Sequence, residues 1–218
     1  MHGLISAWLL AGLSQCRTEE KSARSEEVAK PLQAFTYQQA LMGTRFFITL
    51  YAEDKPQADV AARAAFQYAA EVNSACSDYD VTSELMKLNA APVDTPIALS
   101  DMLYDVLKTS LEIAETTQGA YDPTLGHHSY NWRMARKKNT LPTREKIAAA
   151  IAASGWTHLK IDHANQSITK LAPKMRLDLG GIAKGYAADG MLRILNHHAI
   201  TRASITAGGE VRLGEPPP

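Results

Sequence analysis

The stretch that decides the fold is Leu177-Asp178-Leu179-Gly180-Gly181-Ile182-Ala183-Lys184-Gly185-Tyr186-Ala187-Ala188-Asp189. An alternating run over residues 174–179 predicts a short strand at its start. A glycine turn then leads into a helical pattern that we expect to end near His198. Such a turn places backbone N–H groups and a helix dipole beside one pocket, which suits a phosphate. The same turn is also common as plain punctuation between a strand and a helix.

The spacing of this stretch matches neither of the familiar phosphate-binding loops. It lacks the G-x-G-x-x-G pattern, and it fails the Walker pattern because Gly185 follows Lys184 where Ser or Thr is required. Lys184 adds a positive charge to the turn, and Asp178 adds a carboxylate. Local chemistry alone therefore leaves phosphate binding and simple punctuation both open.

Length and composition indicate a globular protein with no preference for polyanions. The chain has 218 residues, 45% of them hydrophobic, and 23 basic residues balance 23 acidic ones. A net charge of zero gives no sign of a nucleic-acid partner. Two cysteines, Cys16 and Cys76, are too few for a disulfide framework.

The N-terminus predicts a signal sequence, which we assign to residues 1–16. Its apolar run is too short to cross a membrane as a mature helix. Leu13 stands three residues before Cys16, the pattern of a bacterial lipoprotein signal in which that cysteine is lipidated. Gln15 and the lack of Lys or Arg before Gly3 depart from this pattern, and a buried helix with a chance cysteine is the alternative. Residues 17–35 are charged and predict a flexible tether.

Residues 36–218 are expected to form one folded domain. We predict strands over 36–51, 158–161, 167–171, 203–206 and 211–213, helices over 58–76, 100–119 and 144–153, and a short turn or helix over 83–89. Val60, Ala64, Tyr68 and Val72 should form the buried stripe of the first helix. Residues 127–139 are polar and basic and predict a solvated excursion. His127 and His128 point different ways, so shared metal ligation is not expected.

Five separated stretches, in this order, now resemble one family, the FAD:protein FMN transferases, also called the ApbE family. These landmarks are Met42-Gly43-Thr44, Tyr79 with Ser83-Glu84-Leu85 and Leu88-Asn89, Gly119 to Gly126, Asp178 to Asp189, and Ala207 to Val211. The resemblance implies an α+β fold of mixed or antiparallel sheets packed with helices. It also implies a Mg²⁺-dependent transfer of FMN from FAD to a Thr or Ser hydroxyl of a target flavoprotein, with release of AMP.

The resemblance also names the site residues. FAD contacts are expected at Met42, Tyr79, Ala120, Tyr121, Asp122, Asp178 and Lys184. The backbone carbonyl of Gly181 is expected at the Mg²⁺. The resemblance implies that its other ligands lie in a C-terminal part that family members have beyond this point. The chain stops just as a strand begins, so we also expect the sequence to be a fragment. No catalytic base can be named. Many members are exported and lipid-anchored, which implies the periplasmic side of the bacterial inner membrane.

Four of these residues also have a simpler interpretation. Tyr79 could stack on a flavin or adenine ring, or be a core tyrosine with a satisfied hydroxyl. Asp122 and Asp178 could bond adenine or ribose, or could be turn carboxylates. Lys184 could neutralise the pyrophosphate or face solvent.

The segment 126–132 departs from the family, because it lacks the apolar residues usual after the Asp-Pro-Thr loop. Two other functions therefore stay open beside the transferase. One is an FAD-binding lipoprotein without catalysis, and the other is an FAD pyrophosphatase that gives FMN and AMP.

Overall fold

The computed structural model describes residues 30–218. The predicted signal sequence, residues 1–16, and the tether up to residue 29 lie outside the described residues. Residues 31–218 form one folded unit. Its first strand, β1 (Gln33–Leu41), begins inside the segment assigned to the tether, so that prediction is wrong for residues 33–35. These residues pair with the end of the next strand, where Gln33 lies opposite Ala52.

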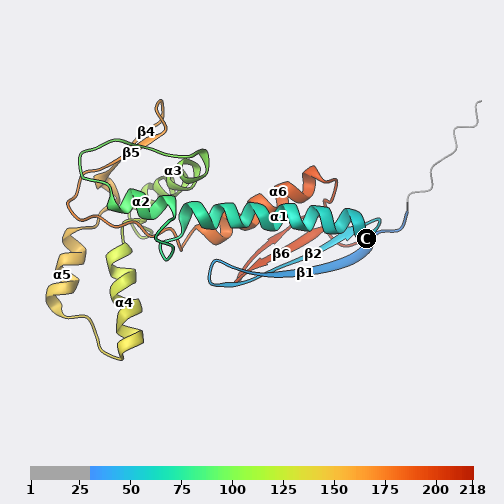
Figure 1. Cartoon of the computed structure of the whole chain (residues 1–218), viewed down its shortest axis with the longest axis horizontal. Coiled ribbons are helices and arrows are strands. Elements are labelled where there is room, and N and C mark those ends of the chain that lie inside the picture. The colour runs from blue at the N-terminus through green and yellow to red at the C-terminus, as the bar shows by residue number, and fades with distance from the viewer. Residues whose placement is uncertain (1–29) are drawn as a thin grey trace, which may run out of the picture. The chain divides into compact units, whose positions relative to one another are not determined.

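The larger sheet has four antiparallel strands in the order β1-β2-β6-β7. The other three strands are β2 (Thr44–Ala52), β6 (Ala203–Ala207) and β7 (Glu210–Leu213). Phe46, Ile48 and Leu50 alternate along β2 and are fully buried, so they form the inner face of this strand. The helices α1 (Lys55–Cys76) and α6 (Ala183–His197) pack together on this sheet (Figure 1).

Small residues let α1 and α6 approach closely. A Cβ atom at Gly190 of α6 would lie 1.9 Å from Cε1 of Tyr68 on α1. The expected stripe on α1 is wrong at Val60, which is 52% exposed. The buried face is built mainly from alanines instead, at Ala58, Ala61, Ala62, Ala65 and Ala69. The close approach of α1 and α6 therefore leaves room for small side chains on the buried face of α1, and not for larger ones.

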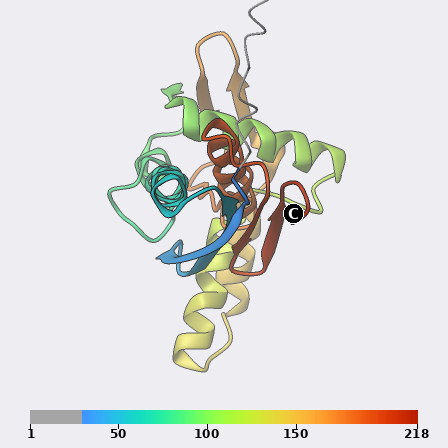
Figure 2. The same ribbon diagram turned by 90° about the vertical axis from the view of Figure 1, so that its right-hand side faces the viewer.

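The smaller sheet has three antiparallel strands in the order β3-β5-β4. These strands are β3 (Ile97–Ala98), β4 (Leu159–Asp162) and β5 (Ser167–Lys170). Around them lie α2 (Glu84–Ala90), α3 (Asp101–Thr116), α4 (Gly126–Lys138), α5 (Arg144–Ala152) and the short 3₁₀ helix η1 (Trp156–His158). The predicted α+β class, with antiparallel sheets and packed helices, is confirmed. Figure 2 shows α4 and α5 side by side.

Hydroxyl side chains cap the first turn of three of these helices. The side chains of Ser83, Ser100 and Thr143 accept hydrogen bonds from backbone N–H groups in the first turn of α2, α3 and α5. These caps fix where each helix starts. They also fix the loops that precede the helices.

Two sequence predictions are wrong in this part of the chain. Residues 174–179 form no strand and make only an isolated bridge between Arg176 and Leu125. The prediction for residues 127–139 missed a helix: their side chains are mostly exposed or half-buried, as expected, but they form most of α4, which ends at Asn139 in a left-handed conformation. Basic residues in the last turn of α4 also favour this end of the helix. Within residues 30–218, no helix is both long and apolar enough to cross a membrane.

Candidate functional site

Three segments that are far apart in the sequence meet at one end of α1. They are the loop after α1, the loop between α3 and α4, and the segment that leads into α6. Backbone hydrogen bonds join the last two, because Asp178 N donates to Pro123 O at 2.9 Å and Gly126 N donates to Arg176 O at 3.0 Å. The two loops therefore run alongside each other without forming a sheet.

The side chain of Asn89 replaces the strand partner that this segment lacks. Its Oδ1 accepts from Leu177 N at 2.7 Å, and its Nδ2 donates to Leu177 O at 3.1 Å. Both polar groups of this half-buried side chain are thereby satisfied. This explains why an alternating run resembles a strand but is not one.

The site itself is a cleft made of two adjoining hollows of about 500 Å³ and 780 Å³ that share Asp78, Tyr79 and Gly180. We call it the Tyr79 cleft. All seven residues for which the sequence predicts FAD contacts line it, namely Met42, Tyr79, Ala120, Tyr121, Asp122, Asp178 and Lys184. Gly181, the predicted metal contact, lines it as well. The fold thus brings together residues predicted from four separate motifs.

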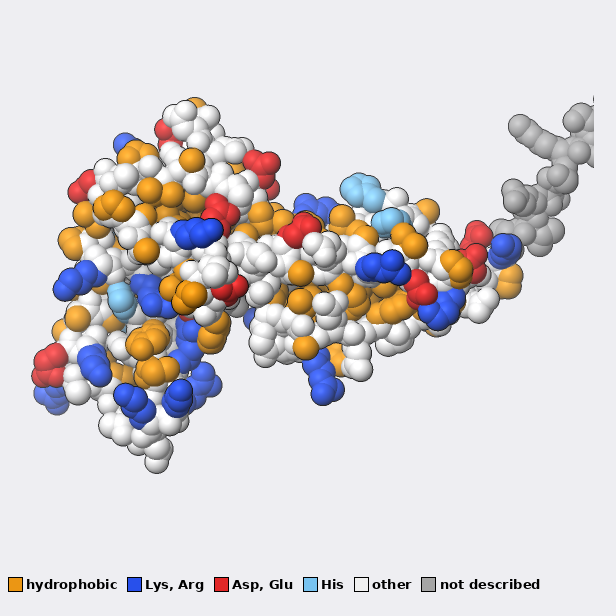
Figure 3. All heavy atoms as spheres, in the orientation of Figure 1, with side chains coloured by type: hydrophobic (Ala, Val, Ile, Leu, Met, Phe, Trp, Pro, Cys, Tyr) orange, Lys and Arg blue, Asp and Glu red, His pale blue; other side chains and the backbone are white. Residues whose placement is uncertain are grey.

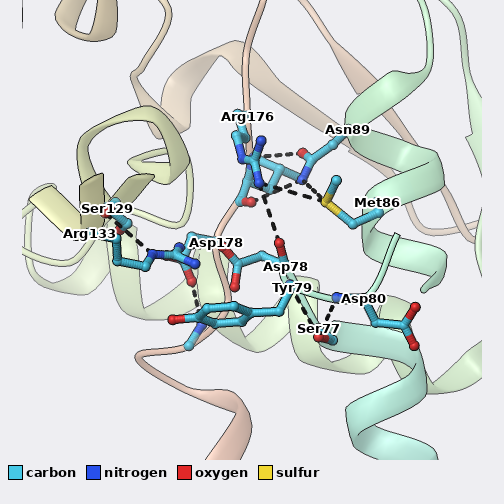
Figure 4. Close-up of polar contacts among 12 residues, drawn as sticks. Ser77, Asp78, Tyr79, Asp80, Met86, Asn89, Ser129, Arg133, Arg176 and Asp178 are labelled. Carbon is cyan, nitrogen blue, oxygen red and sulfur yellow. Dashed lines mark hydrogen bonds and ion pairs between the residues drawn. The ribbon is translucent and has the colours of Figure 1, made fainter. Parts of the chain in front are cut away.

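Tyr79 lies at the centre of the cleft and is 76% exposed. The alternative interpretation of Tyr79 as a core residue is therefore wrong. The guanidinium of Arg133 lies over the Tyr79 ring, 4.4 Å from its centroid (Figure 4). Because the cation covers one face of an otherwise exposed ring, the ring is held ready to stack with its other face.

Arg133 also joins two carboxylates. Its Nη2 atom contacts Oδ2 of Asp78 and lies 3.0 Å from Oδ2 of Asp178 (Figure 4). The Nε atom of Arg133 donates to Ser129 O at 3.3 Å, within α4. Burial by itself lowers the pKa of Arg133, but the hydrogen bond and charge of Asp78, with smaller charge effects from Tyr79 and Asp178, raise it overall. Arg133 therefore remains a cation at any working pH.

The carboxylates of the cleft do not share one role. Oδ1 of Asp178 accepts a hydrogen bond from Gly180 N at 2.8 Å, and its Oδ2 accepts one from Nη2 of Arg133 at 3.0 Å. Asp122 accepts from Thr124 N at 2.7 Å and Thr124 Oγ1 at 2.6 Å, and from Trp156 N at 3.1 Å. Both oxygens of Asp122 are thus used to hold its own loop, so its predicted contact with FAD stays a prediction.

A tight hairpin turn places Met42 in the cleft. Met42 and Gly43 connect β1 to β2 with φ values of +50° and +72°. Positive φ at both central positions matches the twist of a two-residue hairpin but is costly for a side chain such as that of Met42. Across the cleft, Lys184 Nζ donates to Gly180 O at 3.2 Å and lies 3.0 Å from Glu210.

The described residues do not by themselves build a metal site. Within residues 30–218, no group of three or more His, Cys, Asp or Glu side chains is gathered for a metal ion. Asp78 and Asp178 are already bonded to Arg133. At Gly181, an added Cβ would lie 3.3 Å from Cε2 of Tyr121, so a bare backbone suits this crowded position.

Sequence reasoning missed the cleft residues on α4. Trp132, Arg133 and Arg136 line the cleft, and so does Asp78 next to Tyr79. Arg133 and Arg136 stand three residues apart, which places them on one face of a helix. That spacing could have identified them, but the prediction of an excursion over residues 127–139 removed the helix on which it depends. Figure 3 shows Lys and Arg side chains gathered over α4 and α5.

Comparison with known proteins agrees with this geometry. A sequence model of the ApbE family matches residues 42–218. The chain is 30% identical to the FAD:protein FMN transferase of Klebsiella pneumoniae (strain 342) over 202 residues, which cover 90% of this chain and 56% of that protein. It is 30% identical over 211 residues to the protein of the same name from Salmonella typhimurium (strain LT2), covering 94% of this chain and 58% of the relative.

Solved structures show the same relationship. The flavin transferase ApbE from Vibrio cholerae superposes with a TM-score of 0.75 at 27% identity, covering 84% of this chain and 60% of that one. An ApbE protein from Thermotoga maritima gives a TM-score of 0.75 at 28% identity, covering 83% of this chain and 59% of that one. This chain therefore spans little more than half the length of these relatives. Since the family model matches most of its residues, the chain belongs to the ApbE family.

Proposed function

We propose that this chain is part of an FAD:protein FMN transferase that binds FAD in the Tyr79 cleft. The proposed reaction moves FMN from FAD to a Thr or Ser hydroxyl of a target flavoprotein and releases AMP. The observation that carries the proposal is the gathering in one cleft of all seven residues expected to contact FAD. The names of the relatives support the reaction type.

The charges of the cleft suit a dinucleotide. The exposed ring of Tyr79 offers one face to a flavin or adenine ring. Lys184 and Arg136 line the cleft and supply positive charge for a pyrophosphate. Breaking a phosphoanhydride demands mainly positioning and charge neutralisation. These side chains would therefore contribute by orienting FAD and balancing its charge.

Mg²⁺ enters the proposal through the family resemblance. As a hard cation that takes oxygen ligands, it would balance charge on the pyrophosphate when bound. Among the described residues, the Gly181 carbonyl is the contact expected for it. The base that activates the acceptor hydroxyl is not identified among residues 30–218.

An FAD titration of the 218-residue chain tests the proposal. Flavin fluorescence is followed with and without Mg²⁺, and circular dichroism checks that each variant is folded. We expect binding to the unaltered chain and its loss in Asp178→Ala and Lys184→Ala, whereas Lys160→Ala on the exposed side of β4 serves as the control. Binding that survives both substitutions would show that FAD does not occupy the Tyr79 cleft.

Product analysis separates the transferase from its alternatives. FAD is incubated with Mg²⁺, the chain and a flavoprotein that offers an acceptor Thr or Ser. Covalent flavin on the acceptor together with free AMP supports the transferase. Free FMN and AMP without labelled acceptor indicate a pyrophosphatase, and bound but unchanged FAD indicates a binding protein.

We also propose that the chain is exported and anchored by a lipid on Cys16, on the periplasmic side of the inner membrane. The support is the apolar segment before Cys16 and the family resemblance. Incorporation of a labelled fatty acid should depend on Cys16 and be lost in Cys16→Ser. Equal labelling of both forms would overturn the anchor.

A further inference from the structure

A second hollow, of about 460 Å³, shares no residue with the Tyr79 cleft. We call it the Lys170 hollow. It lies between the C-terminal end of α2, the start of α4 and the segment after β5. Its lining residues are Met86, Asn89, Ala90, Ala91, Pro92, Val93, His127, Lys170, Lys174, Met175 and Arg176. Three of these carry a fixed positive charge, and none is Asp or Glu.

No carboxylate balances these three cations inside the described part of the chain. Lys170, Lys174 and Arg176 take part in none of the salt bridges formed by residues 30–218. Positive charges without counter-charges are costly to gather and to bury, because each loses hydration and repels the others. An arrangement of this kind is stabilised when an anion binds.

Lys170 shows this imbalance most clearly. The residue is only 3% exposed, although lysine is almost never buried without a partner. Its ammonium group donates to Asn89 O at 2.7 Å. An ammonium group has three donors, so two remain without a partner among the described residues.

Arg176 is also incompletely bonded. Its Nε atom is buried and has no hydrogen-bond partner in the described structure. The Nη2 atom makes only long contacts, 3.4 Å to Asp78 O and 3.9 Å to Sδ of Met86 (Figure 4). The guanidinium carbon lies 5.5 Å from the centroid of the Tyr130 ring. A guanidinium normally uses its planar donors on an oxyanion, and here those donors are largely unused.

We propose that the Lys170 hollow binds a small oxyanion of the phosphate class. Lys170 and Arg176 would supply buried donors, and the exposed Lys174 would supply charge at the entrance. Apolar residues such as Pro92 and Val93 line the rest of the hollow, which leaves room for a small organic group on the phosphate. The site is separate from the FAD cleft and does not rest on the proposed transferase activity.

Calorimetric titration of the full 218-residue chain with inorganic phosphate tests the proposal. Chloride replaces phosphate in the reference titration at equal ionic strength, because a general salt effect must be subtracted. We expect saturable binding to the unaltered chain. In Lys174→Gln the affinity should fall at least tenfold, and Lys170→Met should abolish binding. Lys160→Gln, which removes an exposed lysine from β4, should leave binding unchanged.

A second control separates this hollow from the FAD cleft. Lys184→Gln removes one cation of the Tyr79 cleft and should not alter phosphate binding. If Lys184→Gln abolishes binding and Lys174→Gln does not, phosphate occupies the Tyr79 cleft and the proposal is overturned. Absence of saturable binding to the unaltered chain overturns it as well, and this outcome does not depend on any variant being folded.

A further titration with phenyl phosphate identifies the form of the ligand. Tighter binding of phenyl phosphate than of inorganic phosphate supports a phosphate monoester that uses the apolar lining. Tighter binding of inorganic phosphate supports the free ion. In both cases Lys174→Gln must weaken binding. An affinity that is unchanged in this variant would contradict the assigned site.

Discussion

The Tyr79 cleft and the Lys170 hollow are linked by Arg176, which lines the hollow and contacts the backbone of Asp78 in the cleft, but buried charge is balanced differently in the two sites. In the cleft, one cation, Arg133, holds two carboxylates and covers the ring of Tyr79. In the hollow, three cations line one cavity without a carboxylate. The cleft is held in shape by contacts within the protein, whereas the hollow retains unused donors.

This difference bears on what each site can do. A preorganised cleft loses little entropy when its ligand binds, because its side chains are already held. A group of unpaired cations gains most from a ligand that brings the missing negative charge. The comparison therefore predicts that substitutions in the cleft damage stability first, and that substitutions in the hollow change anion binding and pH dependence first.

The largest effect is expected from Arg133→Leu. This change leaves Asp78, with a side chain 5% exposed, and Asp178, 15% exposed, without their common cation. Removing one partner of a buried ion pair costs about 3–5 kcal/mol, so the free energy of unfolding should fall by about 3 kcal/mol. Urea unfolding at pH 7 measures it.

The control for Arg133→Leu is Lys137→Leu, an exposed residue on the same helix. Adding Asp78→Asn to Arg133→Leu should recover part of the loss, because one stranded charge is removed. An equal loss in Lys137→Leu, or no recovery in the double variant, would show that Arg133 does not act through the two carboxylates.

The next effect is expected from Gly126→Ala, at the backbone contact between the two regions. A Cβ atom at Gly126 would lie 2.6 Å from the carbonyl oxygen of Arg176, and a backbone atom cannot easily move away. Overpacking of this kind costs about 1–3 kcal/mol of unfolding free energy. Gly185→Ala is the matched control, since an added Cβ meets nothing within 4 Å there. It lies inside α6 and should stabilise the chain by about 0.5–1 kcal/mol. If both changes stabilise, the contact at Gly126 is not tight.

Tyr79→Ala should weaken FAD binding about tenfold, equivalent to about 1.4 kcal/mol, with little effect on stability because the ring is largely exposed. Tyr79→Phe keeps the stacking surface and should bind FAD within about twofold of the unaltered chain. Flavin fluorescence titration measures both. A large loss in Tyr79→Phe would mean that the hydroxyl, and not the ring, makes the contact.

The smallest effect concerns the pH dependence of stability at Lys170. Burial lowers the pKa of Lys170 below its ordinary value, so the unfolded chain keeps that proton to higher pH than the folded chain. This residue therefore makes the free energy of unfolding rise with pH between the lowered pKa and about 10.4. Lys174, Arg176 and His127 are the other charged or titratable residues that line the same hollow.

Urea unfolding between pH 7 and pH 10 checks this prediction against Lys170→Met. As the pH rises, the free energy of unfolding of the unaltered chain should increase relative to that of the variant. Bound phosphate should reduce this increase with pH, because an anion keeps the ammonium group of Lys170 charged. A difference between the two proteins that stays constant with pH would contradict the lowered pKa.

Local features of the fold could be predicted because they depend on neighbouring residues. The hydroxyls of Ser100 and Thr143 cap their helices wherever the helix lies, and the alternation of Phe46, Ile48 and Leu50 needs only one buried face. The wrong predictions fall where distant contacts decide. Residues 174–179 alternate like a strand, but Asn89 from α2 takes the place of a neighbouring strand.

The sequence by itself determined the family, because the order of its motifs is recognisable at about 30% identity to the relatives. That resemblance in turn gave the residues expected to contact FAD. Only the tertiary structure decided that Arg133 holds Asp78 and Asp178 together, and that Lys170 is buried without a counter-charge. The physical reason is that charge pairing and burial depend on which distant segments meet. Local sequence patterns report the preferences of neighbouring residues, whereas the electrostatics of a site are set by contacts between residues 45 to 98 positions apart.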